Sequence, residues 1–313
     1  MTPEPAGGWS EFRGQFPVLE QCVYLNAGTE GPIPTVAVEA LKQRVDHDSR
    51  AGRIGPEYID GVLELAQQAR AAYARVLGAA TREVALTDST TSGINTVLGG
   101  LTLEPGDEIV TSEHEHPGLL APLRRLVVRY GVKVRTAPLS ELVREVGERT
   151  RLIACSHVTW VSGEVADVPA LLASGVPVLL DGAQALGAIP VNVTQLGVDY
   201  YAASGQKWLC GPEGSGALYV RRDRLAGLEP PWPGYGALSD PNAGLNSGLV
   251  GDSRRLDTGF PVVQRSAWAL AAIELLEFYG WDWVFGRASF MAGVLAIGLQ
   301  ERGLSVASRG APP

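Results

Sequence analysis

The chain has 313 residues, of which 45% are hydrophobic, so it is long enough to bury a large core as one main domain with an appended piece. Its formal net charge of −8 and the absence of a basic run argue against a surface for nucleic acid or an anionic membrane, and favour a small molecule as partner. The three cysteines form no CxxC pair, no stretch reaches about 18 consecutive apolar residues, and the N-terminus lacks a signal-peptide pattern, so we expect a cytoplasmic protein without a membrane span.

The N-terminal part of the chain predicts an arm followed by two helices. The segment QCVYLNAGTEGPIP (21–34) predicts a short strand that runs into a Gly/Pro turn, and Pro34 suits the first turn of a helix. Apolar residues then recur at helical spacing over 35–45 and again over 57–78, where Gly78 ends the second helix.

From residue 83 onward, short β-branched runs alternate with helical ones, among them LSELVREV (139–146). Strands are predicted at 83–88, 107–112, 132–137, 151–158, 176–181, 198–204 and 216–222. Apolar strands separated by helices indicate βαβ units, and hence a mainly parallel sheet covered on both faces. Ligands of such sheets bind beyond the carboxyl ends of the strands, so the polar residues there are the functional candidates. Residues 228–260 predict a long loop, and 263–300 predict helices.

Lysine is scarce in this chain, because the 26 basic residues include only Lys42, Lys133 and Lys207. An imine requires an amine, since a guanidinium stays protonated. Lys207 follows a predicted strand, where burial and nearby dipoles would lower the pKa of its amine. Lys42 falls on an amphipathic helix and Lys133 beside the start of a strand, where solvated roles suffice. Lys207 is therefore the candidate for a Schiff base, and the alternative is a surface lysine on a turn.

Two segments predict a phosphate site. Ser89, Thr90 and Thr91 lie between a strand and the start of a helix, where hydroxyls and free backbone N–H groups can receive a phosphate. An ordinary helix cap is the alternative. Ser204 and Gln206, just before Lys207, are further candidate ligands.

Asp181 closes the apolar run VPVLL, so its carboxylate leaves a buried strand and needs a cationic or hydrogen-bonding partner. A protonated pyridinium nitrogen is one such partner, and the pairing keeps the ring an electron sink. Gln184, three residues further on, is placed to donate to the phenolic oxygen of such a ring. The alternative for this segment is a helix cap followed by a turn of small residues.

The segment EHEHPG (113–118) holds two of the four histidines and supports two hypotheses. One is a zinc hydrolase built on His114 and His116, since imidazoles and carboxylates bind zinc. The other places an imidazole over a pyridine ring, with His116 as first choice and His114 as reserve. The metal hypothesis leaves the phosphate and lysine segments without a role, so we favour stacking and predict no metal.

Taken together, DGAQALG (181–187) and SGQKWLCGPEGSGALYV (204–220), preceded by YLNAG, STTSGIN and EHEHPG, carry a family resemblance. The chain resembles the class V aminotransferase-like enzymes of pyridoxal 5′-phosphate (PLP) fold type I, which include cysteine desulfurases, selenocysteine lyases and isopenicillin N epimerase. The resemblance covers about residues 18–300. It implies an α/β fold with an N-terminal arm (1–33), a large PLP-binding domain (34–262) and the helical start of a truncated C-terminal small domain (263–313).

At the matched positions the resemblance implies a role for each candidate residue. Lys207 would hold PLP as a Schiff base, with Asp181 at the pyridinium nitrogen and His116 stacked on the ring. The other implied contacts are Gln184 at O3′, the phosphate ligands Thr90, Thr91, Ser204 and Gln206, and the substrate neighbours Asn26 and Gly28. Family members are homodimers with active sites at the subunit interface, so a homodimer is implied here as well.

The resemblance also implies Schiff-base chemistry on an amino acid, and we expect C–S bond cleavage on a cysteine-like substrate. Gln206 stands where desulfurases usually have histidine, which favours the lyase and epimerase-like branches. One alternative is an aminotransferase or epimerase of the same family. Another is a PLP-binding protein made inactive by loss of the C-terminal domain, which supplies an arginine for the substrate carboxylate. Cys210 is interpreted as a small buried residue in a tight turn, without a catalytic role.

Overall fold

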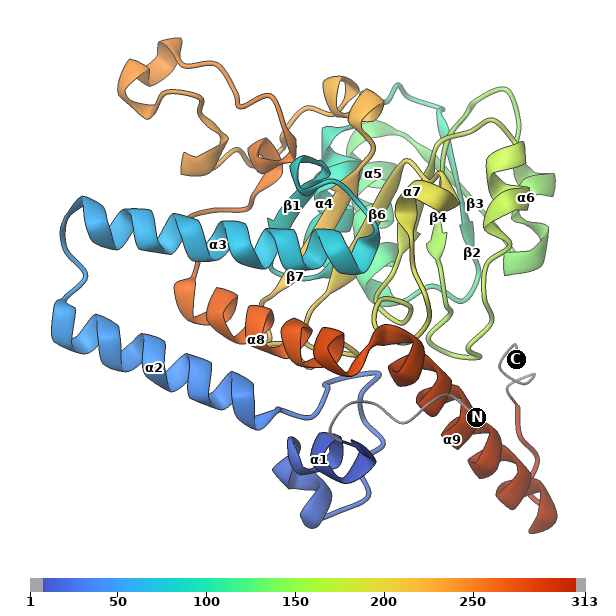
Figure 1. Ribbon diagram of the computed structural model, residues 1–313. Helices are drawn as coiled ribbons and strands as arrows, with labels where there is room; N and C mark the ends of the chain where they lie inside the picture. The colour runs from blue at the N-terminus through green and yellow to red at the C-terminus, as the bar shows by residue number, and fades with distance from the viewer. Residues whose placement is uncertain (1–7, 308–313) are drawn as a thin grey trace.

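The computed structural model describes residues 8–307, whose strands form one seven-stranded sheet in the order β1-β7-β6-β5-β4-β2-β3 (Figure 1). The strands are β1 (Val84–Thr87), β2 (Glu108–Ser112), β3 (Lys133–Ala137), β4 (Thr150–Ser156), β5 (Val178–Asp181), β6 (Tyr200–Ser204) and β7 (Gly216–Val220). Strand β7 runs antiparallel to β1 and β6, while the other neighbours pair in parallel. Each strand overlaps a predicted run, and the mainly parallel sheet is confirmed.

Helices cover both faces of the sheet, with α4 and α5 on one face and α3 and α8 on the other (Figure 1). The helices of the described residues are α1 (Gly8–Gly14), α2 (Thr35–Ala51), α3 (Gly55–Leu77), α4 (Thr90–Gly100), α5 (Pro117–Tyr130), α6 (Val168–Ala173), α7 (Val193–Leu196), α8 (Val263–Tyr279) and α9 (Trp281–Glu301). Helix α3 ends as predicted at Gly78, whose φ of 64° is a left-handed conformation that favours glycine.

The two faces of the sheet carry separate apolar clusters, because successive residues of a strand point to opposite sides. On β4, Leu152 packs in the cluster that contains Ile94 of α4, whereas Ile153 packs in the cluster that contains Tyr73 of α3. All four residues are essentially inaccessible to solvent. This double burial explains why the central strands are continuous apolar runs rather than alternating ones.

The strand predicted at the start of segment 21–34 is wrong. Val23 and Leu25 are 85% and 78% exposed, and the segment has no neighbouring strand with which to pair in residues 8–307. Residues 26–30 form a local turn instead, in which the Asn26 carbonyl accepts from the amides of Thr29 and Glu30 at 2.8 and 2.9 Å. A β-like composition does not form a strand without a partner edge.

The helix predicted at 139–146 forms a 3₁₀-helix, Leu139–Glu145, rather than an α-helix. Its buried side chains, Leu139 and Leu142, are three residues apart. A 3₁₀-helix has three residues per turn and therefore brings both onto one face.

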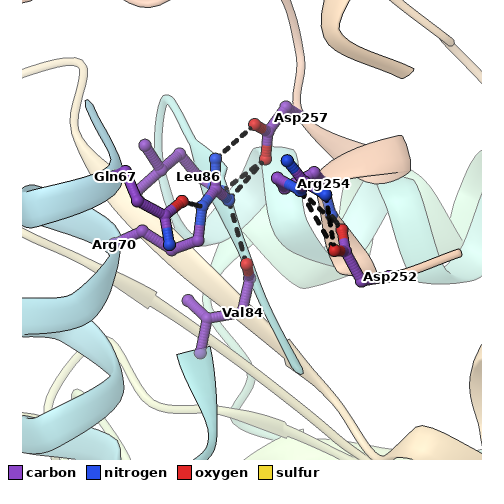
Figure 2. A network of polar contacts seen from close by, with 7 residues as sticks. All are labelled: Gln67, Arg70, Val84, Leu86, Asp252, Arg254 and Asp257. Atoms are coloured by element: carbon purple, nitrogen blue, oxygen red, sulfur yellow. Dashed lines mark hydrogen bonds and ion pairs between the residues drawn. The ribbon is translucent and has the colours of Figure 1, made fainter. Parts of the chain in front are cut away.

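Residues 228–260 form the predicted long loop, which carries the short 3₁₀-helices Tyr235–Ala237, Pro241–Asn246 and Ser253–Leu256 and projects beyond the sheet in Figure 1. Where the loop comes back to the sheet, Asp257 bonds it to neighbouring elements (Figure 2). Arg70 of α3 donates to both oxygens of Asp257 at 2.9 and 2.7 Å, and Asp257 also accepts from the amide of Leu86 at 2.9 Å. Arg70 donates in addition to the carbonyl of Val84 at 2.9 Å. The buried ion pair thus ties the end of the loop to α3 and β1.

Helix α9 leads away from the sheet and packs only near its start (Figure 1). There, Trp283 contacts the rings of Trp9 and Phe12, with centroid distances of 6.4 and 5.1 Å. The sequence shows no unbroken apolar run of membrane-spanning length. Among residues 8–307, however, α9 is one helix that is long and apolar enough on average to cross a membrane, and none of its stretch Trp281–Gln300 is buried.

Candidate active site

The polar residues that end the central strands meet at the carboxyl edge of the sheet. Ser156 ends β4, Asp181 ends β5 directly opposite it in the parallel register, and Ser204 ends β6. Thr90 begins α4, which packs on β6. The sheet therefore brings together segments that lie more than 100 residues apart in the chain.

Lys207 lies on the segment 205–215 between β6 and β7, which we call the lysine turn and which is held by backbone hydrogen bonds. The Gly205 amide donates to the Ser215 carbonyl and the Gly211 amide to the Gly205 carbonyl, both at 2.8 Å. The Cys210 amide donates to the backbone carbonyl of Lys207 at 3.0 Å. Cys210 is buried in this turn with a φ of 55°, as its interpretation as a small buried residue expects, and burial raises the pKa of its thiol to about 12. A thiol with that pKa is not a nucleophile near neutral pH.

The Lys207 side chain is half-buried, and this burial lowers the pKa of its amine, although Asp181 and Glu30 act in the opposite direction. A lysine must be neutral to attack a carbonyl group, so partial desolvation favours the reactive form. The geometry agrees with the sequence-based choice of Lys207 among the three lysines.

Asp181 is buried and has one oxygen left for a partner. Its Oδ1 accepts from the Ala183 amide at 2.9 Å, while Oδ2 accepts no hydrogen bond from residues 8–307. Burial raises the pKa of Asp181 to about 6, and the charge of Glu115 adds to this, whereas the Ala183 bond and Lys207 lower it. A carboxyl group in this setting gains most from a cation at Oδ2.

Ionisation of Asp181 is expected to destabilise the cofactor-free protein. The unfolded chain releases this proton near pH 3.8 and the folded protein near pH 6, so the free energy of unfolding should fall as the pH rises through this window, by about 3 kcal/mol. Asp181→Asn should therefore be more stable than the wild type above pH 6 and equally stable below pH 4. Urea unfolding across this range measures the difference.

His157, with a pKa lowered to about 4 by burial, gives a slope of opposite sign over an overlapping range. It is present in both proteins, so its contribution cancels in the comparison. Parallel stability curves for the wild type and Asp181→Asn would contradict the expectation.

Three buried polar atoms close to the start of α4 and the lysine turn have no partner among the described residues. They are Thr90 Oγ1, Ser204 Oγ and Gln206 Oε1. Buried polar atoms are nearly always hydrogen-bonded, so these three atoms, one in the first residue of α4 and two at and just after the end of β6, indicate a place for a polar ligand. Ser89 caps α4, because its side chain accepts from the Ser92 amide at 3.1 Å. The structure therefore supports both interpretations of this segment, a helix cap and a ligand site.

His116 is the N-cap of α5 and its ring has a fixed orientation. Nδ1 accepts from the Gly118 amide at 3.0 Å, and the ring meets Trp160 edge-on at a centroid distance of 5.4 Å. Burial and the charge of Lys207 lower the pKa of His116, so its neutral form is favoured. A Cβ at position 118 would collide with Thr91 Oγ1, so Gly118 allows the close approach of the His116 and Thr91 segments.

Gln184 is held between the arm and the lysine turn. Its Nε2 donates to the Gly28 carbonyl at 2.8 Å, and its Oε1 accepts from Trp208 Nε1 at 3.0 Å. One hydrogen on Nε2 remains for the predicted O3′ contact, which stays a prediction. Asn26 is exposed on the same arm segment.

The arm also contacts the lysine turn directly. The Gly31 amide donates to the Gln206 carbonyl at 2.6 Å, and a Cβ at position 31 would overlap the carbonyl oxygen of Lys207. Only glycine allows this approach of the two backbones. Gly28 and Gly31 of the arm therefore contact Gln184 and the turn that carries Lys207, while the role of Asn26 and Gly28 beside the substrate stays a prediction.

The metal hypothesis required His114 and His116 to share an ion. The His114 side chain is 70% exposed and lies 3.9 Å from Glu113, while His116 Nδ1 is used by the cap. Across residues 8–307, no group of three His, Cys, Asp or Glu side chains is arranged to hold a metal ion. The geometry thus offers no support for a zinc hydrolase.

Two buried features of the site were not predicted. Glu115 accepts hydrogen bonds from Ser112 and Ser156, and His157 Nδ1 lies 3.0 Å from the Tyr201 hydroxyl next to Asp181. The sequence signal for Glu115 was its position in EHEHPG, just after the predicted strand at 107–112, but its burial depends on hydrogen bonds to β4, about 40 residues further along the chain.

The chain matches the family described as "Aminotransferase class-V" over residues 23–303. Curated relatives include isopenicillin N epimerase of Streptomyces clavuligerus, 33% identical over 71% of this chain and 59% of its own length, and a cysteine desulfurase of Pectobacterium atrosepticum, 32% identical over 72% and 61%. This chain thus spans about 60% of the length of these two relatives.

Solved structures also resemble the chain. A C-DES mutant with glycine covalently linked to its PLP cofactor superposes with a TM-score of 0.89 at 30% identity, covering 92% of this chain and 80% of the other. The cystine C–S lyase C-DES in complex with its product cysteine persulfide has a TM-score of 0.88 at 30% identity, covering 91% and 80%.

Proposed function

Because the chain belongs to the class V aminotransferase family, we propose that it is a PLP-dependent enzyme that cleaves a C–S bond of a cysteine-like amino acid. The main observation behind the proposal is that three features lie at one edge of the sheet. They are the half-buried Lys207, the buried carboxyl group of Asp181, and buried polar atoms that have no hydrogen-bond partner among the described residues. Support for the cofactor and the reaction comes from the similar C-DES structures, one with glycine covalently linked to its PLP cofactor and one of the cystine C–S lyase with its product cysteine persulfide.

The residues present fit PLP. Thr90, Ser204 and Gln206 offer buried atoms that need a partner, next to the free amides of α4, and would hold the phosphate. Asp181 Oδ2 would accept from the protonated ring nitrogen, and the His116 ring would cover one face of the cofactor. When bound, PLP supplies an electron sink for the charge that develops at the substrate Cα.

Lys207 has two tasks in this proposal. Its amine is the attachment point for the cofactor aldehyde, and burial favours the neutral form that this requires. With a substrate amino acid bound, Lys207 Nζ would remove the proton from the substrate Cα and hold it. The electron pair left at Cα would then expel the sulfur substituent of the neighbouring carbon as an anion, which can take the proton held by Lys207, while an ionised Asp181 would pair with the protonated ring nitrogen.

Product analysis tests the proposal. The purified protein is loaded with PLP and incubated with cystine, cysteine and an S-alkylcysteine, with alanine as a control that has no sulfur to lose. We expect release of a sulfur product from at least one cysteine-type substrate and none from alanine. Loss of that activity in Lys207→Ala ties the reaction to the site.

Other products would overturn the proposal in distinguishable ways. A racemised amino acid, or a keto acid formed without sulfur release, would indicate the epimerase or aminotransferase alternative. Visible absorbance of bound PLP that no amino acid changes would indicate a cofactor-binding protein without turnover. Stoichiometric zinc without PLP would restore the metal hypothesis.

We further propose a homodimer in the cytoplasm, as the family resemblance and the sequence suggest. Sedimentation of the PLP-loaded protein at several concentrations measures the oligomeric state. A monomer at all concentrations would contradict the dimer.

A further inference from the structure

Glu115 is a buried carboxyl group to which the proposed chemistry gives no role. It is 3% exposed, yet both of its oxygens are bonded: Oε1 accepts from Ser112 Oγ and from the Ser156 amide at 2.9 Å, and Oε2 accepts from Ser156 Oγ. No lysine or arginine of residues 8–307 forms an ion pair with it. Burial of a carboxyl group without a cation is costly unless hydrogen bonds replace its hydration, and three donors do so here.

These bonds join the ends of two neighbouring strands. Ser112 is the last residue of β2, and Ser156 is the last residue of β4, opposite Asp181 in the register with β5. His116 follows Glu115 immediately and begins α5 as its N-cap. The position of the His116 imidazole therefore depends on the two hydrogen bonds that Ser156 donates to Glu115, which we call the clamp.

Glu115 also contributes to the charge around Asp181. The titratable groups near Asp181 are Glu115 after β2, Cys155 and His157 at the end of β4, Tyr201 on β6 and Lys207 after β6. Burial raises the pKa of Cys155 and Tyr201 well above their usual values and lowers that of His157 to about 4, so these three are neutral near pH 7. Glu115 and Lys207 remain as the neighbours that act on Asp181 by charge, with opposite effects.

We propose that Glu115 is a positioning residue for both His116 and Asp181. It clamps the loop that carries the imidazole to the end of β4, opposite Asp181, and its negative charge acts on the carboxyl group that would pair with the ring nitrogen. This inference rests on the proposed function, because that function places His116 and Asp181 around one cofactor ring.

Two variants separate the clamp from the charge. Glu115→Gln keeps the shape, because the amide oxygen can accept from the Ser156 amide while its NH₂ group donates to Ser156 Oγ. Glu115→Ala removes both clamp and charge. The matched control is Glu108→Gln, at the opposite end of β2, where the carboxyl group pairs with Arg135.

The first measurement is the carboxyl ¹³C titration of Asp181 in the cofactor-free protein, assigned with Asp181→Asn. Loss of a negative charge nearby should lower the Asp181 midpoint in Glu115→Gln by roughly 0.5 to 1 pH unit. The second is turnover of the PLP-loaded enzyme, where kcat should fall about threefold to tenfold with KM changed less than about twofold. Glu108→Gln should leave both unchanged.

An Asp181 midpoint and a kcat that are unchanged in Glu115→Gln, with only a lower Tm in Glu115→Ala, would overturn the proposal and leave Glu115 a purely structural residue. The titration needs neither cofactor nor turnover. A wild-type protein without C–S cleavage would therefore refute the proposed function, while the Asp181 midpoint still decides the role of Glu115.

Discussion

Lys207→Ala is expected to abolish covalent retention of PLP and to reduce turnover by roughly 10²- to 10⁴-fold, the usual contribution of a positioned acid–base group. The reason is chemical, since alanine offers neither an amine for the cofactor aldehyde nor a base at the substrate Cα. The measurement is the visible absorbance of the PLP-loaded protein, followed by borohydride reduction and mass analysis of the labelled peptide.

The chain supplies its own matched controls, because it has only two other lysines. Lys42 is exposed and paired with Glu39 at 3.4 Å, and Lys133 is exposed at the start of β3. Lys42→Ala and Lys133→Ala should retain covalent PLP at the wild-type level. Label on either of these lysines, or unchanged absorbance in Lys207→Ala, would refute the assignment.

The central strands of the sheet were predictable because they are buried on both faces. Runs such as VLL (178–180) and LIAC (152–155) are buried at every position, and in the structure Leu152 and Ile153 point into separate cores. Segment 21–34 has a similar local composition but no partner edge, and a strand exists only where a neighbour supplies hydrogen bonds. Pairing of this kind is a property of the whole fold, which local sequence does not contain.

The candidate site was predictable in its strand-end residues and not in its cross-chain contacts. Lys207, Asp181 and Ser204 follow buried runs, so their place at the carboxyl edge follows from the parallel sheet. The Gln184 amide bonds the carbonyl of Gly28, 156 residues earlier, and Glu115 bonds Ser156, 41 residues later. No periodicity or spacing encodes such pairs, since each depends on how distant loops return to the sheet.

Removal of one partner of the buried Arg70–Asp257 pair in Figure 2 is expected to cost more stability than the same change in an exposed ion pair. Arg70 and Asp257 have side chains only 5% and 12% exposed, and the Leu86 amide shares the same carboxylate. Asp257→Ala would leave a buried guanidinium without its partner and a backbone amide without its acceptor. We expect the free energy of unfolding to fall by about 3–5 kcal/mol, measured by urea denaturation.

Glu277→Ala is the control for the loss expected in Asp257→Ala, because it breaks an ion pair of similar geometry that is exposed to solvent. Arg75 donates to both oxygens of Glu277, at 3.0 and 2.7 Å, but the Arg75 side chain is 51% exposed. Water replaces the lost partner there, so the cost should be about 1 kcal/mol or less. Similar losses in the two variants would show that burial of the Arg70–Asp257 pair adds nothing. A larger loss at Asp257 that Arg70→Met then partly reverses would identify the uncompensated buried charge as its cause.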